Sequence, residues 1–132
     1  MSTPIRPIGP YPPVVRAGPW LICSGQLGVL PPSDTAGAGT PPVLVDGGVQ
    51  AQLTQALVNA QELLRGQGAT IEHVVKTTVF VTDPGDFPAV NEAYTAFFGD
   101  HRPARSMVAV SALPAGAAVE IELWAYAPGS GE

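Results

Sequence analysis

The chain has 132 residues, of which 45% are hydrophobic and only 13% charged, and its formal net charge is -5 at pH 7. This composition excludes a disordered chain and predicts one domain, long enough to bury a core. Six Lys and Arg in total disfavour nucleic-acid binding, because affinity for a phosphate backbone depends largely on cationic side chains. So little surface charge also favours a homo-oligomer.

Several kinds of functional site have no signature in the sequence. The lone Cys23 excludes an internal disulfide, and His73 and His101 lack the spacing of metal ligands. The sequence contains no GxxxxGK[ST], GxGxxG or GxSxG stretch. Its first fifteen residues, MSTPIRPIGPYPPVV, have no basic region followed by an uninterrupted apolar run. We therefore expect a soluble, cytoplasmic protein without a metal.

The first half of the chain predicts two strands, a loop and a helix. Residues 14–29 (VVRAGPWLICSGQLGV) predict two short strands joined at residues 17–19, the second ending at Ser24-Gly25. Residues 30–48, rich in Pro and Gly, predict a surface loop. Beyond the loop, apolar residues at helical spacing indicate an amphipathic helix: Val49, Leu53, Leu57, Ala60 and Leu64.

The second half predicts a strand, a helix and two further strands. Residues 73–83 (HVVKTTVFVTD) are rich in the β-branched residues Val and Thr and indicate a strand inside the sheet. Asp86 at an N-cap position and Pro88 in the first turn predict a second helix, which ends at Gly99. Two further strands are predicted over residues 104–113 (ARSMVAVSAL) and 117–127 (AAVEIELWAYA). This order of elements predicts an α+β fold with a mixed sheet and both helices on one face.

Alternation along the last two strands predicts where their polar side chains lie. Glu120, Trp124 and Tyr126 fall on the face opposite the helices. The same counting allows Arg105 and Met107 to lie on that face too, so we expect Arg105 to share it with Glu120. A solvated face would explain the charges most simply. The aromatic residues and Met107 favour instead a face covered by a ligand or a second subunit.

Five short motifs occur together in the chain: G-P-Y, S-G-Q, V-N-E-x-Y, P-A-R-S and V-E-I-E. In order and spacing, over about residues 6–127, the sequence resembles the RidA/YjgF family, also called L-PSP endoribonucleases or translation inhibitors. The resemblance implies a single chorismate-mutase-like domain over residues 1–132 and a homotrimer with clefts between subunits. It also implies a cofactor-independent 2-iminobutanoate/2-iminopropanoate-type deaminase, which hydrolyses reactive enamines and imines to 2-oxo acids and ammonia.

The resemblance also implies roles for individual residues. Arg105 of P-A-R-S is expected to clamp the substrate carboxylate, for which a planar guanidinium is well shaped. Glu120 of V-E-I-E is expected to position or activate the attacking water. The resemblance places further residues in the substrate pocket, where packing or loop-fixing roles are the simpler alternatives: Tyr11, Ser24, Gly25, Phe87 and Asn91.

Two departures from the family pattern leave the substrate range open. Pro12 and Pro13 stand where the family often has polar residues, and they stiffen the segment. Met107 stands where many members have Cys, which argues against thiol-based regulation at that position. The alternatives are a non-catalytic module that binds 2-oxo acids, which would need Arg105 but not Glu120, and a divergent hydrolase with a pathway-specific substrate. The low cationic content disfavours a ribonuclease.

Overall fold

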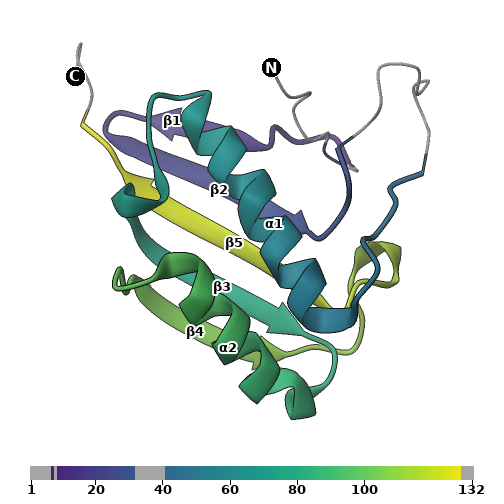
Figure 1. The fold of residues 1–132 in the computed structure, drawn as a ribbon. Helices are drawn as coiled ribbons and strands as arrows, with labels where there is room; N and C mark the ends of the chain where they lie inside the picture. The colour runs from purple at the N-terminus through teal and green to yellow at the C-terminus, as the bar shows by residue number, and fades with distance from the viewer. Residues whose placement is uncertain (1–6, 8, 32–40, 129–132) are drawn as a thin grey trace.

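A five-stranded sheet covered on one face by two helices makes up the described part of the protein, as Figure 1 shows. The computed structural model describes residues 7, 9–31 and 41–128, so residues 32–40 of the predicted loop lie outside it. The strand order is β1-β2-β5-β3-β4; β3 and β4 pair in parallel, and the other pairs are antiparallel. The bounds are β1 (Val14–Ala17), β2 (Trp20–Leu27), α1 (Gly48–Arg65), β3 (Val74–Val81), α2 (Phe87–Phe98), β4 (Ala104–Ala109) and β5 (Val119–Tyr126).

These elements confirm the predicted α+β fold, including the interior position of β3. α2 begins immediately after Asp86 and ends at Gly99, where the backbone adopts φ 64°. A side chain would be strained in that conformation, which explains the glycine. None of the helices in the described ranges is long and apolar enough to cross a membrane.

The core lies between the sheet and the helices, and alternate side chains of each strand enter it. On β5, Val119, Ile121 and Leu123 are buried, whereas Trp124 and Tyr126 are exposed on the other face. This confirms the alternation predicted for the last strand. The buried side chains of α1 are Leu53, Ala56, Leu57, Asn59, Ala60, Leu63 and Leu64.

The only cysteine belongs to this core. Cys23 of β2 is buried, with 2% of its surface exposed. Burial raises the pKa of its thiol to about 12. The side chain therefore packs as a small apolar group and stays protonated at neutral pH.

β2 continues past the dipeptide at which the sequence predicted its end. Its pairing with β5 shifts register between Cys23 and Gln26, because β2 carries one extra residue there. Ser24 and Gly25 thus form a β-bulge, and the strand runs on to Leu27. The predicted end was wrong because a small, permissive dipeptide marks a bulge as readily as a terminus.

A buried asparagine ties α1 to the chain that leaves β2. The Nδ2 group of Asn59 donates to the carbonyl oxygens of Leu27 at 3.2 Å and Val29 at 2.9 Å, and Gln55 Nε2 donates to Asn59 Oδ1 at 2.9 Å. Substituting Asn59→Leu leaves these buried groups unpaired, so we expect a loss of about 2–3 kcal/mol in the free energy of unfolding. Urea denaturation measures this loss of free energy. The exposed-site control Thr54→Leu should change stability by less than about 0.5 kcal/mol, and equal losses would contradict the role of Asn59.

Candidate functional site

Arg105 lies on the helix-covered face of the edge strand β4. It is paired in the parallel ladder with Thr77, which is fully buried under the helices, so both side chains leave the sheet on that face. The Arg105 guanidinium lies over the ring of Tyr94, with Cζ 4.8 Å from the ring centroid. Its Nη2 group donates to Oδ1 of Asn91 at 2.7 Å. Arg105 is exposed, so its other N–H donors remain accessible to a ligand.

Glu120 lies on the open face of the sheet. It is paired with Leu27 of β2 and with Phe80 of β3. Val79, next to Phe80, is fully buried under the helices, so Phe80 and Glu120 point to the opposite side. Burial raises the pKa of the Glu120 carboxyl, and the charge of Glu122 raises it further. A carboxyl group that is easier to protonate than usual is suited to exchanging protons with a substrate.

The prediction that Arg105 and Glu120 share one face is therefore wrong. Counting alternate residues separates the two faces of one strand. Only the pairing of β4 and β5 with β3 shows which face of one strand matches which face of the other. That pairing also places Met107 opposite Val79, where it packs against the core and away from Trp124. A single chain thus has the two candidate catalytic residues on opposite faces of the sheet.

The β-bulge places two predicted site residues beside Glu120. A Cβ atom at Gly25 would lie 1.8 Å from Oε2 of Glu120, so the carboxylate lies directly against the Gly25 backbone. Ser24 holds the segment before β1: its Oγ donates to the carbonyl of Pro12 at 2.8 Å, and its backbone N–H donates to the carbonyl of Pro13 at 2.9 Å. Within the bulge, Ser24 thus holds the Pro12-Pro13 segment, and the next residue, Gly25, contacts the Glu120 carboxylate.

Of the other predicted site residues, the structure brings only Asn91 to one of these two places. Tyr11 is exposed, and its backbone N–H donates to the carbonyl of Gly9 at 2.9 Å. Phe87 begins α2 and packs, partly buried, against the core. Asn91, one turn later, accepts the hydrogen bond from Arg105. The structure therefore forms two groups of candidate residues rather than one, and Tyr11 and Phe87 have no described contact with either.

Sequence reasoning missed two residues of the first group. Tyr94 and Thr77 were not among the predicted site residues, yet Tyr94 stacks on Arg105 and its OH lies 2.8 Å from Oγ1 of Thr77. The tyrosine of the V-N-E-x-Y motif was the available signal. We call Arg105, Asn91, Tyr94 and Thr77 the arginine group, and Glu120, Ser24 and Gly25 the glutamate group.

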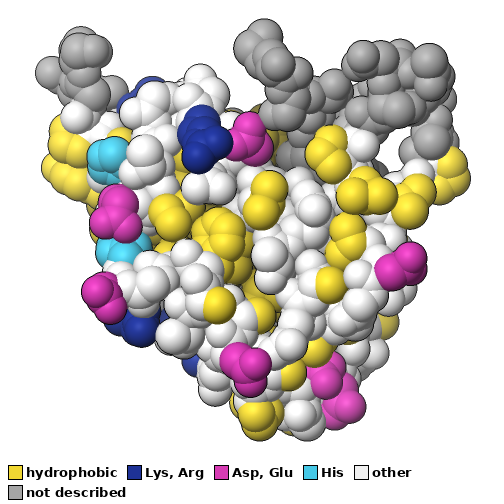
Figure 2. All heavy atoms as spheres, viewed as in Figure 1, with side chains coloured by type: hydrophobic (Ala, Val, Ile, Leu, Met, Phe, Trp, Pro, Cys, Tyr) yellow, Lys and Arg dark blue, Asp and Glu magenta, His cyan; other side chains and the backbone are white. Residues whose placement is uncertain are grey.

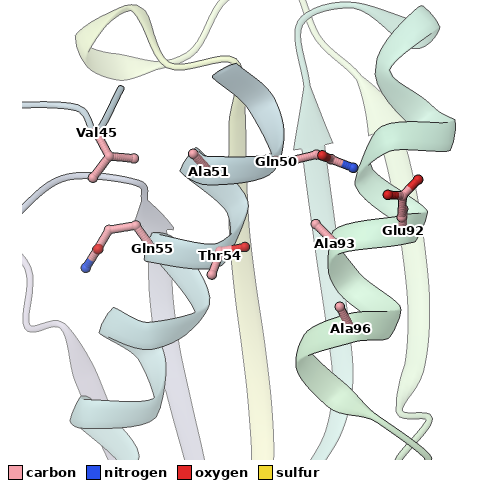
Figure 3. A pocket seen from close by; sticks show the side chains of 8 residues that line it. All are labelled: Val45, Gln50, Ala51, Thr54, Gln55, Glu92, Ala93 and Ala96. Carbon is pink, nitrogen blue, oxygen red and sulfur yellow. The ribbon is translucent and has the colours of Figure 1, made fainter. Parts of the chain in front are cut away.

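A groove of about 500 Å³ lies elsewhere, between α1 and α2 (Figure 3). In the figure, Gln50 of α1 reaches toward α2, and Ala93 and Ala96 line the α2 side. No residue of the arginine or glutamate group is among the residues that line it, which are Val45, Gln50, Ala51, Thr54, Gln55, Glu92, Ala93 and Ala96. The groove is therefore separate from both candidate groups.

Charge on the helix-covered side is scattered rather than concentrated. Figure 2 shows isolated acidic and basic side chains on this side and no continuous basic stripe in the part of the chain that is coloured. Among the described residues, no three His, Cys, Asp or Glu side chains gather as a metal site would require. The distribution of charge does not favour an extended phosphate backbone as a ligand.

Comparison with known proteins identifies the family. The family model described as endoribonuclease L-PSP matches residues 1–127. The 2-iminobutanoate/2-iminopropanoate deaminase of Mus musculus is 43% identical over 115 residues, which cover 87% of this chain and 79% of the mouse protein. The crystal structure of the YjgF gene product from E. coli is 39% identical and superposes with a TM-score of 0.80, covering 95% of this chain and 93% of that one.

A second solved structure carries a ligand. E. coli TdcF, crystallised with bound serine, is 35% identical, with a TM-score of 0.78 over 94% of this chain and 92% of that one. The matched regions include β2, α2, β4 and β5, which carry the arginine and glutamate groups, since the family match extends over residues 1–127. The family resemblance inferred from the five motifs is thus confirmed, and the chain belongs to the endoribonuclease L-PSP family, also known as the YjgF/RidA family.

Proposed function

We propose that this protein hydrolyses reactive 2-imino and 2-enamino acids to 2-oxo acids and ammonia, as a deaminase of the 2-iminobutanoate/2-iminopropanoate type. The observation that carries the proposal is the Arg105 guanidinium, held by Tyr94 and Asn91 with its other donors exposed. Such a group is suited to binding a carboxylate through two parallel hydrogen bonds. The name of the mouse relative and the amino acid bound to E. coli TdcF support this substrate class.

We further propose that a second copy of the chain completes each site. The arginine and glutamate groups lie on opposite faces of one sheet, so a homotrimer with sites between subunits would let one protomer supply Arg105 and its neighbour Glu120. The open sheet face has apolar area to bury: Trp20 packs edge-on against Trp124 and Tyr126, with ring centroids 6.0 and 5.1 Å apart. Exposed aromatic clusters of this kind are typical of subunit interfaces.

The proposed reaction needs only water and proton transfers. Arg105 binds the substrate carboxylate and thereby places the imine carbon beside the glutamate group of the neighbouring protomer. Ionised Glu120 accepts a proton from a water molecule as the water oxygen bonds to the carbon of the protonated imine, giving a neutral carbinolamine. Glu120 then returns the proton to the nitrogen. The C–N bond breaks as the carbinolamine hydroxyl gives its own proton to the again ionised Glu120, which releases ammonia and the ketone. The carbon keeps its oxidation state, so no redox partner takes part.

The raised pKa of Glu120 predicts a particular pH dependence. If the carboxylate is the base, kcat/KM should rise with pH as Glu120 ionises, with a midpoint above that of an ordinary glutamate. The same shift means that ionisation destabilises the folded chain as pH rises through this range, so Glu120→Gln should be more stable than the natural protein at neutral pH. A pH–rate profile, corrected for uncatalysed hydrolysis at each pH, measures the first effect. A folded Glu120→Gln variant with an unchanged profile would contradict the assignment.

The activity itself is tested with freshly generated 2-iminopropionate. An amino-acid oxidase produces the imine, and semicarbazide traps what has not been hydrolysed, so an active protein lowers the yield of semicarbazone. We expect the natural protein to lower it strongly. If the folded natural protein leaves the yield unchanged, the deaminase proposal fails. Binding of 2-oxo acids that requires Arg105 but not Glu120 would then indicate a non-catalytic carboxylate-binding module.

A further inference from the structure

Tyr94 of α2 is fixed at its hydroxyl end and along its ring. Only 5% of its surface is exposed, and its OH forms a 2.8 Å hydrogen bond with Oγ1 of Thr77, which is fully buried on β3. The ring of Phe98, one turn further along α2, lies against it with centroids 4.7 Å apart. A tyrosine hydroxyl that is buried and paired in this way holds its ring in one orientation.

The face of this ring supports Arg105. Cation–π stacking at 4.8 Å sets the plane in which the guanidinium lies. The 2.7 Å hydrogen bond to Asn91, three residues before Tyr94 on α2, sets its rotation within that plane. Two contacts from one helix thus define the direction of the remaining N–H donors. A flexible arginine on an edge strand would otherwise lose side-chain entropy when it binds a carboxylate.

We propose that Tyr94 is a positioning residue: anchored to Thr77, it holds the Arg105 guanidinium ready for the carboxylate of a 2-imino acid and so determines the affinity for that substrate. The inference rests on the proposed function, and it adds a residue that acts through Arg105 without touching the substrate. Burial raises the pKa of Tyr94, although the Thr77 hydrogen bond and the charges of Arg105 and Arg102 oppose the shift. The hydroxyl therefore remains protonated at neutral pH.

Three substitutions separate the anchor from the ring. Tyr94→Leu removes the stacking surface, Tyr94→Phe keeps the ring and removes the hydroxyl, and Thr77→Val removes the hydroxyl's partner at nearly constant shape. We expect KM for 2-iminopropionate to rise about 10-fold in Tyr94→Leu and about 3-fold in the other two, with kcat changed less than about 2-fold. A contact with the carboxylate stabilises the bound substrate and the transition state alike, so its loss raises KM and leaves kcat nearly unchanged.

Phe97→Leu is the matched control, because it also loosens the aromatic packing of α2, but the Phe97 ring lies against Phe98, with 5.7 Å between centroids, and not against Tyr94 or Arg105. It should lower the melting temperature and leave KM unchanged. An equal rise of KM in Phe97→Leu, or an unchanged KM in folded Tyr94→Leu, would overturn the proposal. Should Tyr94→Leu not fold, the other two variants decide, and an unchanged KM in both overturns it.

Binding of pyruvate, measured by calorimetry, separates this inference from the proposed function. If the natural protein binds pyruvate but does not hydrolyse the imine, the deaminase proposal fails, and the positioning role is judged by the same rises in Kd among the variants. Unchanged Kd values would then overturn it. If the natural protein neither binds pyruvate nor hydrolyses the imine, both proposals are wrong.

Discussion

Replacing Arg105 with alanine should lower kcat/KM for 2-iminopropionate by about 10²- to 10³-fold and leave the fold intact. The substitution removes a charge-assisted, two-bond contact with the substrate carboxylate, and losing one partner of such a pair typically costs about 2–5 kcal/mol. Because Arg105 is exposed on an edge strand, its loss opens no cavity in the core. The oxidase-coupled semicarbazide assay measures the activity, and circular dichroism follows the fold.

Two further variants test whether charge or shape is responsible. Arg105→Lys keeps the charge but loses the planar fork, so its activity should lie between those of the natural protein and Arg105→Ala. Arg102→Ala removes a neighbouring exposed arginine that bonds only to the backbone carbonyls of Gly99 and His101 within the described ranges, and it should change kcat/KM less than about 3-fold. If Arg105→Ala unfolds or dissociates the protein, Arg105 is structural and the substrate-clamp assignment is wrong.

Gly25→Ala should reduce activity about 10²-fold, as much as Glu120→Gln. The added methyl group would lie 1.8 Å from Oε2 of Glu120, so the carboxylate has to leave its place against the bulge. The backbone of Gly25 is not left-handed, so the effect comes from this contact rather than from strain in the chain. A displaced general base loses most of its contribution to the rate, which is typically about 10²- to 10⁴-fold. Steady-state kinetics at fixed pH measures the loss.

The matched control is Gly66→Ala at the end of α1. A methyl group there meets only ordinary contacts, at 3.5 and 3.7 Å, and the backbone is right-handed helical. Its activity should equal that of the natural protein. The double variant Gly25→Ala/Glu120→Gln should be little worse than either single variant, since both disable the same carboxylate. Full activity in Gly25→Ala would show that Glu120 does not act from this position.

Periodicity predicted the elements of this fold well, because burial against one layer forces apolar side chains into a helical or alternating repeat. Periodicity could not predict the register in which neighbouring strands pair. Arg105 and Glu120 were assigned to one face because each alternates correctly within its own strand, yet the pairing with β3 places them on opposite faces. The bulge at Ser24-Gly25 was missed for a related reason, since it exists only in the register between β2 and β5.

The candidate site was partly readable from the motifs. They pointed to Arg105 and Asn91, which the structure joins by a hydrogen bond, and to Gly25, which lies against Glu120. The role of Tyr94 beside Arg105 was not predicted, because an aromatic residue on an amphipathic helix matches the pattern of a core residue. Tyr94 is indeed buried. Its contact with Arg105 depends on how α2 crosses β4, which no local pattern encodes.

The burial of Cys23 also bears on how the protein would withstand the proposed substrates. 2-Imino acids, the tautomers of 2-enamino acids, are electrophiles at the imine carbon, and an accessible thiolate would add to it. The Cys23 thiol, with 2% of its surface exposed and a pKa of about 12, offers neither access nor nucleophilic character at neutral pH. Under the proposed function, the one thiol of the chain is therefore out of reach of the substrate, and we expect no inactivation by reaction at sulfur during turnover.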